Sequence, residues 1–143
     1  MAYATTDDMK ARFGEAQMLL LADRDADQVV DADIVALAIG DADAIVDLHV
    51  RGRYAVPLSP VPPEIVRIVC DLARRNLYGD ATTIPDSVLS ADKAARDLLR
   101  LIATGSAVLD AAVAPASAPG AATLKVETSG PEREFTADKM AGF

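Results

Sequence analysis

Cysteine and histidine, the residues from which many metal sites and catalytic centres are built, are almost missing from the sequence. Cys70 and His49 are the only cysteine and the only histidine among 143 residues. A single cysteine cannot form an internal disulfide, and one residue of each type cannot supply a cysteine-rich or histidine-rich zinc site. Cys70 lies beside an apolar helical stripe and is expected to be a small buried side chain. His49 is expected to be a packing or capping residue near a helix end.

Large aromatic side chains and catalytic motifs are also scarce. There is no tryptophan, and aromatic residues make up only 4% of the chain. The sequence contains no glycine-rich phosphate loop, no Gly-x-Ser-x-Gly elbow and no pair of metal-binding histidines. An enzyme that uses acidic residues would need convergent buried carboxylates in a closed pocket, and we expect none. We therefore predict a protein without enzymatic activity.

Long hydrophobic runs are absent as well. No apolar stretch approaches the ~20 residues that cross a bilayer. The N-terminal segment MAYATTDDMK lacks the basic and apolar regions of a signal peptide. These absences predict a soluble protein with no membrane partner that stays in a reducing cytoplasm.

Basic residues are few and unevenly distributed. The formal net charge is −8. Residues 1–47 carry 11 acidic and 3 basic side chains, whereas residues 48–105 carry 6 acidic and 8 basic ones. An acidic chain is poorly suited to gripping a nucleic-acid backbone. The polarity fits head-to-tail association of copies, although a charged surface also serves solubility alone. The basic positions predicted to form the contact between neighbouring copies are Arg51, Arg53, Arg67, Arg74 and Arg75.

The residues that are abundant, mainly small and aliphatic ones, recur at helical spacing. We predict a mainly α fold, a small bundle of four to five helices within residues 1–110. Thr5 or Thr6 caps a first short helix that Gly14 ends, and residues 16–22 follow as a second apolar stretch. Asp31 is placed to cap a long helix that reaches about Val50. Two further helices are predicted over residues 62–77 and 85–104.

Each long segment has a predicted inward face. These positions are Ile34, Ala38, Ile45 and Leu48 in the first, Ile65, Ile68, Val69, Leu72 and Leu77 in the second, and Val88, Ala95, Leu98, Leu99 and Ile102 in the third. Gly40 interrupts the first segment and offers a place for close helix approach.

The composition changes after the helical core. Residues 111–122 form an alanine- and proline-rich linker, and residues 123–143 form an extended C-terminal arm. Alternation over residues 123–128 predicts a short β segment in the arm. The arm is predicted to dock on a neighbouring protein through its apolar residues, which are Leu124, Val126, Phe135, Met140 and Phe143.

An aspartate-rich segment is the most distinctive local pattern. Its oxygens and a backbone carbonyl match the first nine positions of an EF-hand calcium loop, with carboxylates at Asp23, Asp25, Asp27 and Asp31. The match then fails, because Gln28 replaces the turn glycine and Ile34 replaces the bidentate glutamate. We favour a turn that caps the next helix and assign no cofactor. Weak occupancy by Ca²⁺ or Mg²⁺ remains the alternative.

Several short segments together carry a family resemblance. They are Met1-Ala-Tyr-Ala-Thr, Arg12-Phe-Gly, Leu21-Ala-Asp-Arg-Asp-x-Asp, Arg51-Gly-Arg-Tyr-x-Val-Pro-Leu, Val61-Pro-Pro, Cys70-Asp-Leu-Ala-Arg, Leu77-Tyr-Gly and Arg133-Glu-Phe-Thr-x-Asp-Lys-Met-x-Gly-Phe. In this order and spacing, over nearly the whole chain, they resemble the Mu-like phage head–tail connector proteins.

The resemblance implies a structural role in the virion. Such an adaptor forms a ring, usually a dodecamer, beneath the portal protein and offers a surface to the stopper or tail-completion protein. Genomic DNA passes through the ring without sequence-specific binding. The implied location is the virion neck, with the host cytoplasm as the place of assembly. The alternative from another class is a calcium-responsive helical binding module that uses the loop from Asp23 to Asp31.

Overall fold

A computed structural model describes residues 2–79 and 83–112 of the chain. Within these ranges the fold is mainly α, as predicted, with five α-helices and no β-strand. The helices are α1 (Thr6–Phe13), α2 (Glu15–Ala22), α3 (Ala32–Val50), α4 (Pro63–Leu77) and α5 (Asp86–Thr104). The predicted β segment, most of the linker and the whole arm lie outside the described residues.

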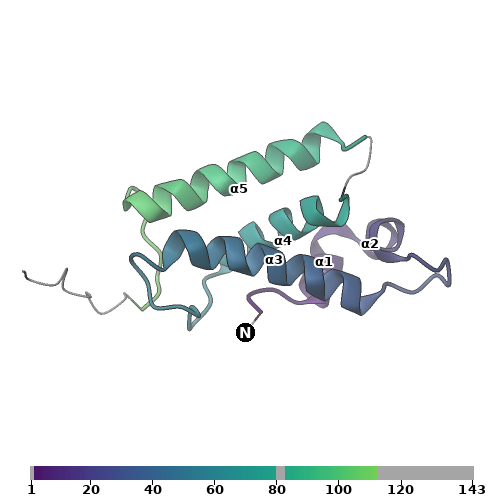
Figure 1. Cartoon of the computed structure of the whole chain (residues 1–143), viewed down its shortest axis with the longest axis horizontal. Helices are drawn as coiled ribbons and strands as arrows, with labels where there is room; N and C mark the ends of the chain where they lie inside the picture. Colours follow the sequence, from purple (N-terminus) through teal and green to yellow (C-terminus); the bar gives the residue numbers. More distant parts are fainter. Residues whose placement is uncertain (1, 80–82, 113–143) are drawn as a thin grey trace, which may run out of the picture.

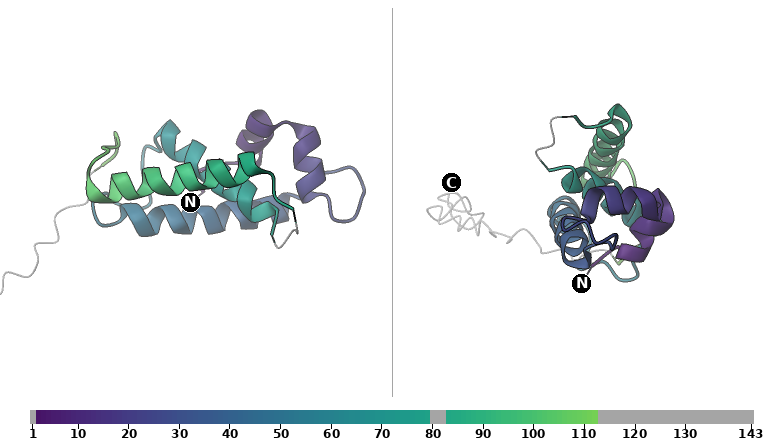
Figure 2. Two further views of the ribbon diagram at one scale, coloured as in Figure 1. Left: turned by 90° about the horizontal axis from the view of Figure 1, so that it is seen from above. Right: turned by 90° about the vertical axis from the view of Figure 1, so that its right-hand side faces the viewer.

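Three long helices form the body of the molecule (Figure 1). Helix α4 packs against both α3 and α5, while α1 and α2 cover one end of the α3–α4 pair. Successive long helices run in opposite directions, so that α3 and α5 end at one end of the molecule and α4 ends at the other (Figures 1 and 2). Because α3 is one continuous helix, the chain segments that precede and follow it lie at opposite ends.

Capping residues explain where most helices begin and end. Thr5 caps α1 in a reciprocal arrangement, because Asp8 N–H donates to Thr5 Oγ1 (3.2 Å) and Thr5 N–H donates to Asp8 Oδ2 (2.8 Å). Gly14 ends α1 at φ +86°, and Gly105 ends α5 at φ +84°, which are left-handed conformations that favour glycine. Pro63 occupies the first position of α4, where its missing N–H costs nothing.

Asp31 departs from its predicted role as a side-chain cap of α3. It stands at the N-cap position, but among the described residues its side chain makes no capping hydrogen bond. Its Oδ2 instead accepts from the backbone N–H of Arg24, at 3.1 Å. The side chain therefore closes the loop that precedes α3.

The core forms around α4. Buried side chains along this helix include Ile65, Ile68, Val69 and Leu72, as predicted, and Cys70 is buried with them. The inward positions predicted for α5 are also confirmed, since its buried residues are Val88, Ala95, Leu99 and Ile102, and Leu98 is partly buried.

The predicted inward face of α3 is wrong by about one position along the helix. Ala38 is buried as expected, but Ile34 and Ile45 are only partly buried and Leu48 is 58% exposed. The buried residues are Val35, Ala38, Ile39, Ala42, Val46 and Val50. Helix α3 carries apolar residues on nearly every side, so spacing alone does not determine which face turns inward. Gly40 is exposed, and a Cβ there would have no described atom within 4 Å, so it mediates no close helix approach in this subunit.

Two buried tyrosines connect segments that are distant in the sequence. Tyr3 donates a hydrogen bond to the Asp47 carboxylate and accepts one from the Leu58 N–H, at 3.1 Å. The Tyr54 hydroxyl accepts from the Leu109 N–H at 2.9 Å. Nearby, the Ala55 N–H donates to the Ala112 carbonyl at 3.0 Å. The segment after α5 is thereby held beside the loop that follows α3.

Candidate functional site

The loop from Asp23 to Asp31 joins α2 to α3 and lies at one extremity of the molecule (Figures 1 and 2). Asp23 Oδ2 accepts from the Gln28 N–H at 3.0 Å, and Asp27 Oδ1 accepts from the Val29 N–H at 2.8 Å. These bonds are typical of aspartate-stabilised turns, which agrees with the predicted turn, although the Asp31 side chain does not cap α3.

Three carboxylates in this loop could also approach a cation. Asp23, Asp25 and Asp27 each offer one oxygen, and these oxygens lie within 4.8 Å of one another. Gln28 adopts φ +65°, a left-handed conformation of the kind that favours the glycine expected at this position in an EF-hand loop. Loss of hydration, followed by the negative charge of Asp27, raises the pKa of Asp25 above its ordinary value. Ile34 offers no ligand atom, so the loop lacks the bidentate carboxylate of a complete calcium site.

The structure does not bring the five candidate arginines together on one surface. Three of them lie in α4 and contact their own subunit. Arg67 Nε lies 3.8 Å from Asp71 Oδ2, and the guanidinium of Arg74 lies 4.6 Å from the centre of the Phe13 ring. Arg75 Nη1 donates to the Gly79 carbonyl at 3.3 Å.

Arg51 and Arg53 occupy a different place. They directly follow α3, and both are exposed. Within residues 2–79 and 83–112 neither forms an ion pair. The guanidinium of Arg53 lies so close to Gly105 that a Cβ on this glycine would overlap it. Because they directly follow α3, the two arginines lie at the end of the molecule opposite the aspartate-rich loop.

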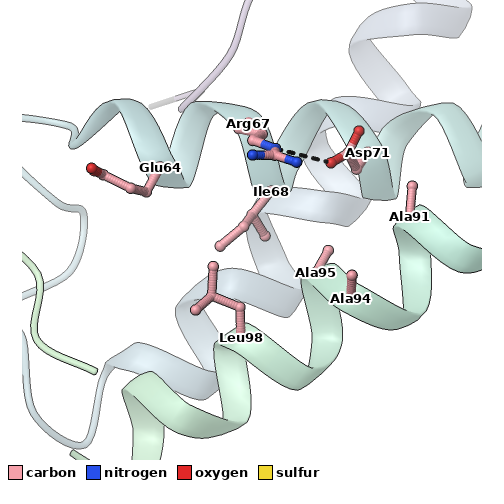
Figure 3. A pocket seen from close by; sticks show the side chains of 8 residues that line it. All are labelled: Glu64, Arg67, Ile68, Asp71, Ala91, Ala94, Ala95 and Leu98. Carbon is pink, nitrogen blue, oxygen red and sulfur yellow. Dashed lines mark ion pairs between the residues drawn. The ribbon is translucent and has the colours of Figure 1, made fainter. Parts of the chain in front are cut away.

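A pocket of about 220 Å³ lies between α4 and α5 (Figure 3). Its floor is apolar and includes Ile68, Ala95 and Leu98, while the Arg67–Asp71 ion pair lies on the α4 wall. Burial raises the pKa of Asp71, and the nearby positive charges of Arg12, Arg67 and Arg74 oppose that rise. The pocket thus combines a small apolar floor with a charge-paired edge.

A second carboxylate group was not found from the sequence. Asp43 and Asp47 lie one turn apart on α3, and the Tyr3 N–H donates to Asp43 Oδ2 at 3.2 Å. Burial raises the pKa of Asp43 to about 6, and the negative charge of Asp47 adds to this effect. Burial and the hydrogen bond to Asp47 raise the pKa of Tyr3 to about 12. No sequence motif links Tyr3 to α3, so only the three-dimensional arrangement reveals the group.

Several predicted features fall where the structure says nothing. The arm residues Leu124, Val126, Phe135, Met140 and Phe143 lie outside the described residues.

Among the helices that are described, none is both long enough and apolar enough to cross a membrane.

Comparison with known proteins gives one family match. A family model described as bacteriophage Mu, Gp36 matches residues 3–128, which include all five helices. No curated protein matches the chain. The match confirms the resemblance to a Mu-like phage protein. The chain belongs to the bacteriophage Mu Gp36 family.

Proposed function

We propose that this protein is a structural subunit of the head–tail connector. Several copies form a ring beneath the portal protein at the virion neck, and the ring links the DNA-filled head to the stopper or tail-completion protein. The protein acts by assembly and not by catalysis. Assembly takes place in the host cytoplasm.

The observation that supports this role most is the family match over residues 3–128. The charge distribution adds a physical argument, because the aspartate-rich loop and the Arg51–Arg53 segment lie at opposite ends of α3. A contact between two different surfaces of identical subunits repeats from copy to copy and closes into a ring when the rotation allows. The proposed ring has twelve copies, as the resemblance implies.

The net charge is compatible with a channel for DNA. At −8, the chain repels the phosphate backbone more than it attracts it. Genomic DNA therefore passes through the proposed ring without being held.

The C-terminal arm is the proposed element that docks on the portal. Two of the three phenylalanines of the chain, Phe135 and Phe143, lie in it. Aromatic side chains dominate the energy of many protein contacts, and an alternating segment such as residues 124–126 suits addition to a sheet edge.

Particle assembly tests this proposal directly. Phage that lack the protein should accumulate DNA-filled heads without tails, and the full-length chain should restore complete particles. A chain without residues 121–143 should fold but fail to restore them, and Phe135→Ala or Phe143→Ala should each restore them in part. Normal completion of heads by the truncated chain would show that the arm is not the docking element.

A calcium-responsive binding module is the second candidate function. The observation that favours it is the cluster of Asp23, Asp25 and Asp27 together with the left-handed conformation of Gln28. A ligand present at 100 times its Kd stabilises the folded state by about 2.7 kcal/mol. Millimolar CaCl₂ should leave the Tm unchanged if the loop is only a turn. A clear rise in Tm that is lost in Asp25→Asn would favour the calcium module.

A further inference from the structure

The two oppositely charged ends are held apart by α3, one of the two longest helices of the fold. Helix α3 has 19 residues. At 1.5 Å per residue, a helix of this length separates its ends by about 28 Å. The loop from Asp23 to Asp31 precedes α3 and the Arg51–Arg53 segment follows it, so the two surfaces cannot meet within one subunit (Figure 1).

The first surface, here called the acidic end, combines carboxylates with exposed apolar side chains. Asp25 and Asp27 are exposed, and no ion pair in the described part of the chain involves either of them. Leu20, in α2 just before the loop, is 81% exposed, and Val29 within the loop is 60% exposed. This end therefore offers a partner both apolar area and unpaired negative charge.

The second surface, here called the basic end, has the same composition with the opposite charge. Arg51 and Arg53 lie there with Val56, and Val108 is 78% exposed in the segment after α5. The hydrogen bonds from Leu109 to Tyr54 and from Ala55 to Ala112 hold the two segments of this surface together. The basic end is therefore an ordered surface built from two parts of the chain.

We propose that the acidic end of one copy binds the basic end of the next copy. Asp25 and Asp27 face Arg51 and Arg53 across this contact, while Leu20 and Val29 pack against Val56 and Val108. Burial of the apolar side chains supplies affinity, and the charges determine orientation. Two like ends repel each other, so the contact is head-to-tail and repeats from copy to copy, closing into a ring when the rotation allows.

This inference rests on the proposed ring and names its contact residues. It leaves out Arg67, Arg74 and Arg75, because these side chains already contact Asp71, Phe13 and Gly79 within the subunit. A second copy of the chain is the partner that the two surfaces fit, since aspartates predominate at one end and arginines at the other and both ends expose apolar side chains.

Cross-linking between variants that each carry one added cysteine tests the contact. Leu20→Cys and Val108→Cys place one thiol at each end, and both original side chains are exposed, so the fold should tolerate the changes. The native Cys70 is buried, and its pKa is raised to about 11, so it should not react. A short bismaleimide added to the mixed variants should give heterodimers several-fold in excess of random pairing. Lys93→Cys, an exposed position in the middle of α5, replaces either partner as the control and should give no excess.

Charge reversal then tests the proposed pairing. Arg51→Glu with Arg53→Glu in the Val108→Cys chain should lower the heterodimer yield to that of random pairing. Asp25→Arg with Asp27→Arg in the Leu20→Cys chain should restore it. Circular dichroism of each variant checks that the fold is intact.

The cross-linking is carried out with free protein at high concentration and with particles assembled from the variants. A heterodimer excess in either sample supports the contact. Random pairing in both, or an excess that charge reversal leaves unchanged, would overturn it. If particle necks contain a ring of this protein but the two ends do not cross-link, the contact fails while the connector function stands.

Discussion

Burial beside Tyr3 raises the pKa of Asp43 into a pH range in which the stability of the fold can be measured. The folded-state pKa of about 6 lies above the ordinary value of 3.8. Between these two pH values the folded chain holds a proton that the unfolded chain has lost. The stabilising contribution of this proton is fully present below pH 3.8 and is lost as the pH rises through 6.

We predict that Asp43→Asn removes this pH dependence. Thermal unfolding of both proteins from pH 4 to 8 should show that the Tm of the original chain falls relative to that of Asp43→Asn as the pH rises through about 6. Asp33→Asn, which removes an exposed carboxylate from the same helix, is the matched control and should retain the fall in Tm through about pH 6. Parallel profiles for Asp43→Asn and the original chain would contradict the assigned ionisation.

Gly40 offers a second prediction for a single residue. It lies inside α3, is exposed, and has no described atom within 4 Å of the place where a Cβ would stand. Gly40→Ala should therefore stabilise the fold by about 0.5–1 kcal/mol, because alanine loses less conformational entropy in a helix. Chemical denaturation measures the change. Gly105→Ala should act in the opposite direction, since φ is +84° there and a Cβ would overlap Arg53. Destabilisation by Gly40→Ala would show that this face of α3 is covered.

The orientation of α3 about its own axis determines which of its apolar residues contribute to stability. Ile39 is 3% exposed and Leu48 is 58% exposed, although the sequence pattern favoured Leu48 as an inward residue. Ile39→Ala should cost about 2–5 kcal/mol in the free energy of unfolding, whereas Leu48→Ala should stay within about 0.5 kcal/mol. Urea denaturation measures the free energy of unfolding of the two variants. Equal losses would mean that α3 is rotated from the orientation described.

Helix α4 provides the corresponding prediction for the centre of the core. Leu72 is fully buried between helices. Leu72→Ala should lower the free energy of unfolding by about 2–5 kcal/mol through lost burial and a residual cavity. Leu89→Ala, at an exposed position of α5, is the comparison and should change it by no more than about 0.5 kcal/mol. A loss at Leu72 as small as that at Leu89 would place α4 outside the core.

The sequence predicts helix bounds well where a local signal marks them. Thr5, Gly14, Pro63 and Gly105 mark such bounds, and each acts within a few residues of its own position. The inward face of α3 is harder to predict, because apolar residues surround that helix and only packing against the other helices, chiefly α4, selects one side. The Tyr3 contacts with α3 and Leu58 are not predictable from spacing, since they join segments far apart in the chain.

In the candidate site, too, arrangements that join distant parts of the chain are not predictable from the sequence. The aspartate-rich turn could be recognised from adjacent residues, whereas the separation of the five arginines depends on the antiparallel order of α3 and α4. Arg51 and Arg53 share a surface because both directly follow one helix. Arg74 lies at the opposite end of the molecule because the next helix runs back.

For the whole molecule, the helical core and the C-terminal arm should be separable. The core includes the contact between Ala55 and Ala112, and the five helices of the described residues lie before residue 113. A chain that ends at residue 112 should therefore keep the Tm and helix content of the full chain. Circular dichroism during thermal unfolding measures both. A large drop in Tm would show that residues 113–143 contribute to the core.

In the proposed function, copies of this protein form a ring between the head and the tail. A cryo-electron microscopy reconstruction of the particle neck, with mass spectrometry of the same particles, tests this role. We expect a ring beneath the portal into which the five-helix core fits, with the acidic end of each copy against the basic end of its neighbour. A neck without this protein, or one in which it occurs as isolated copies, would exclude the proposed ring.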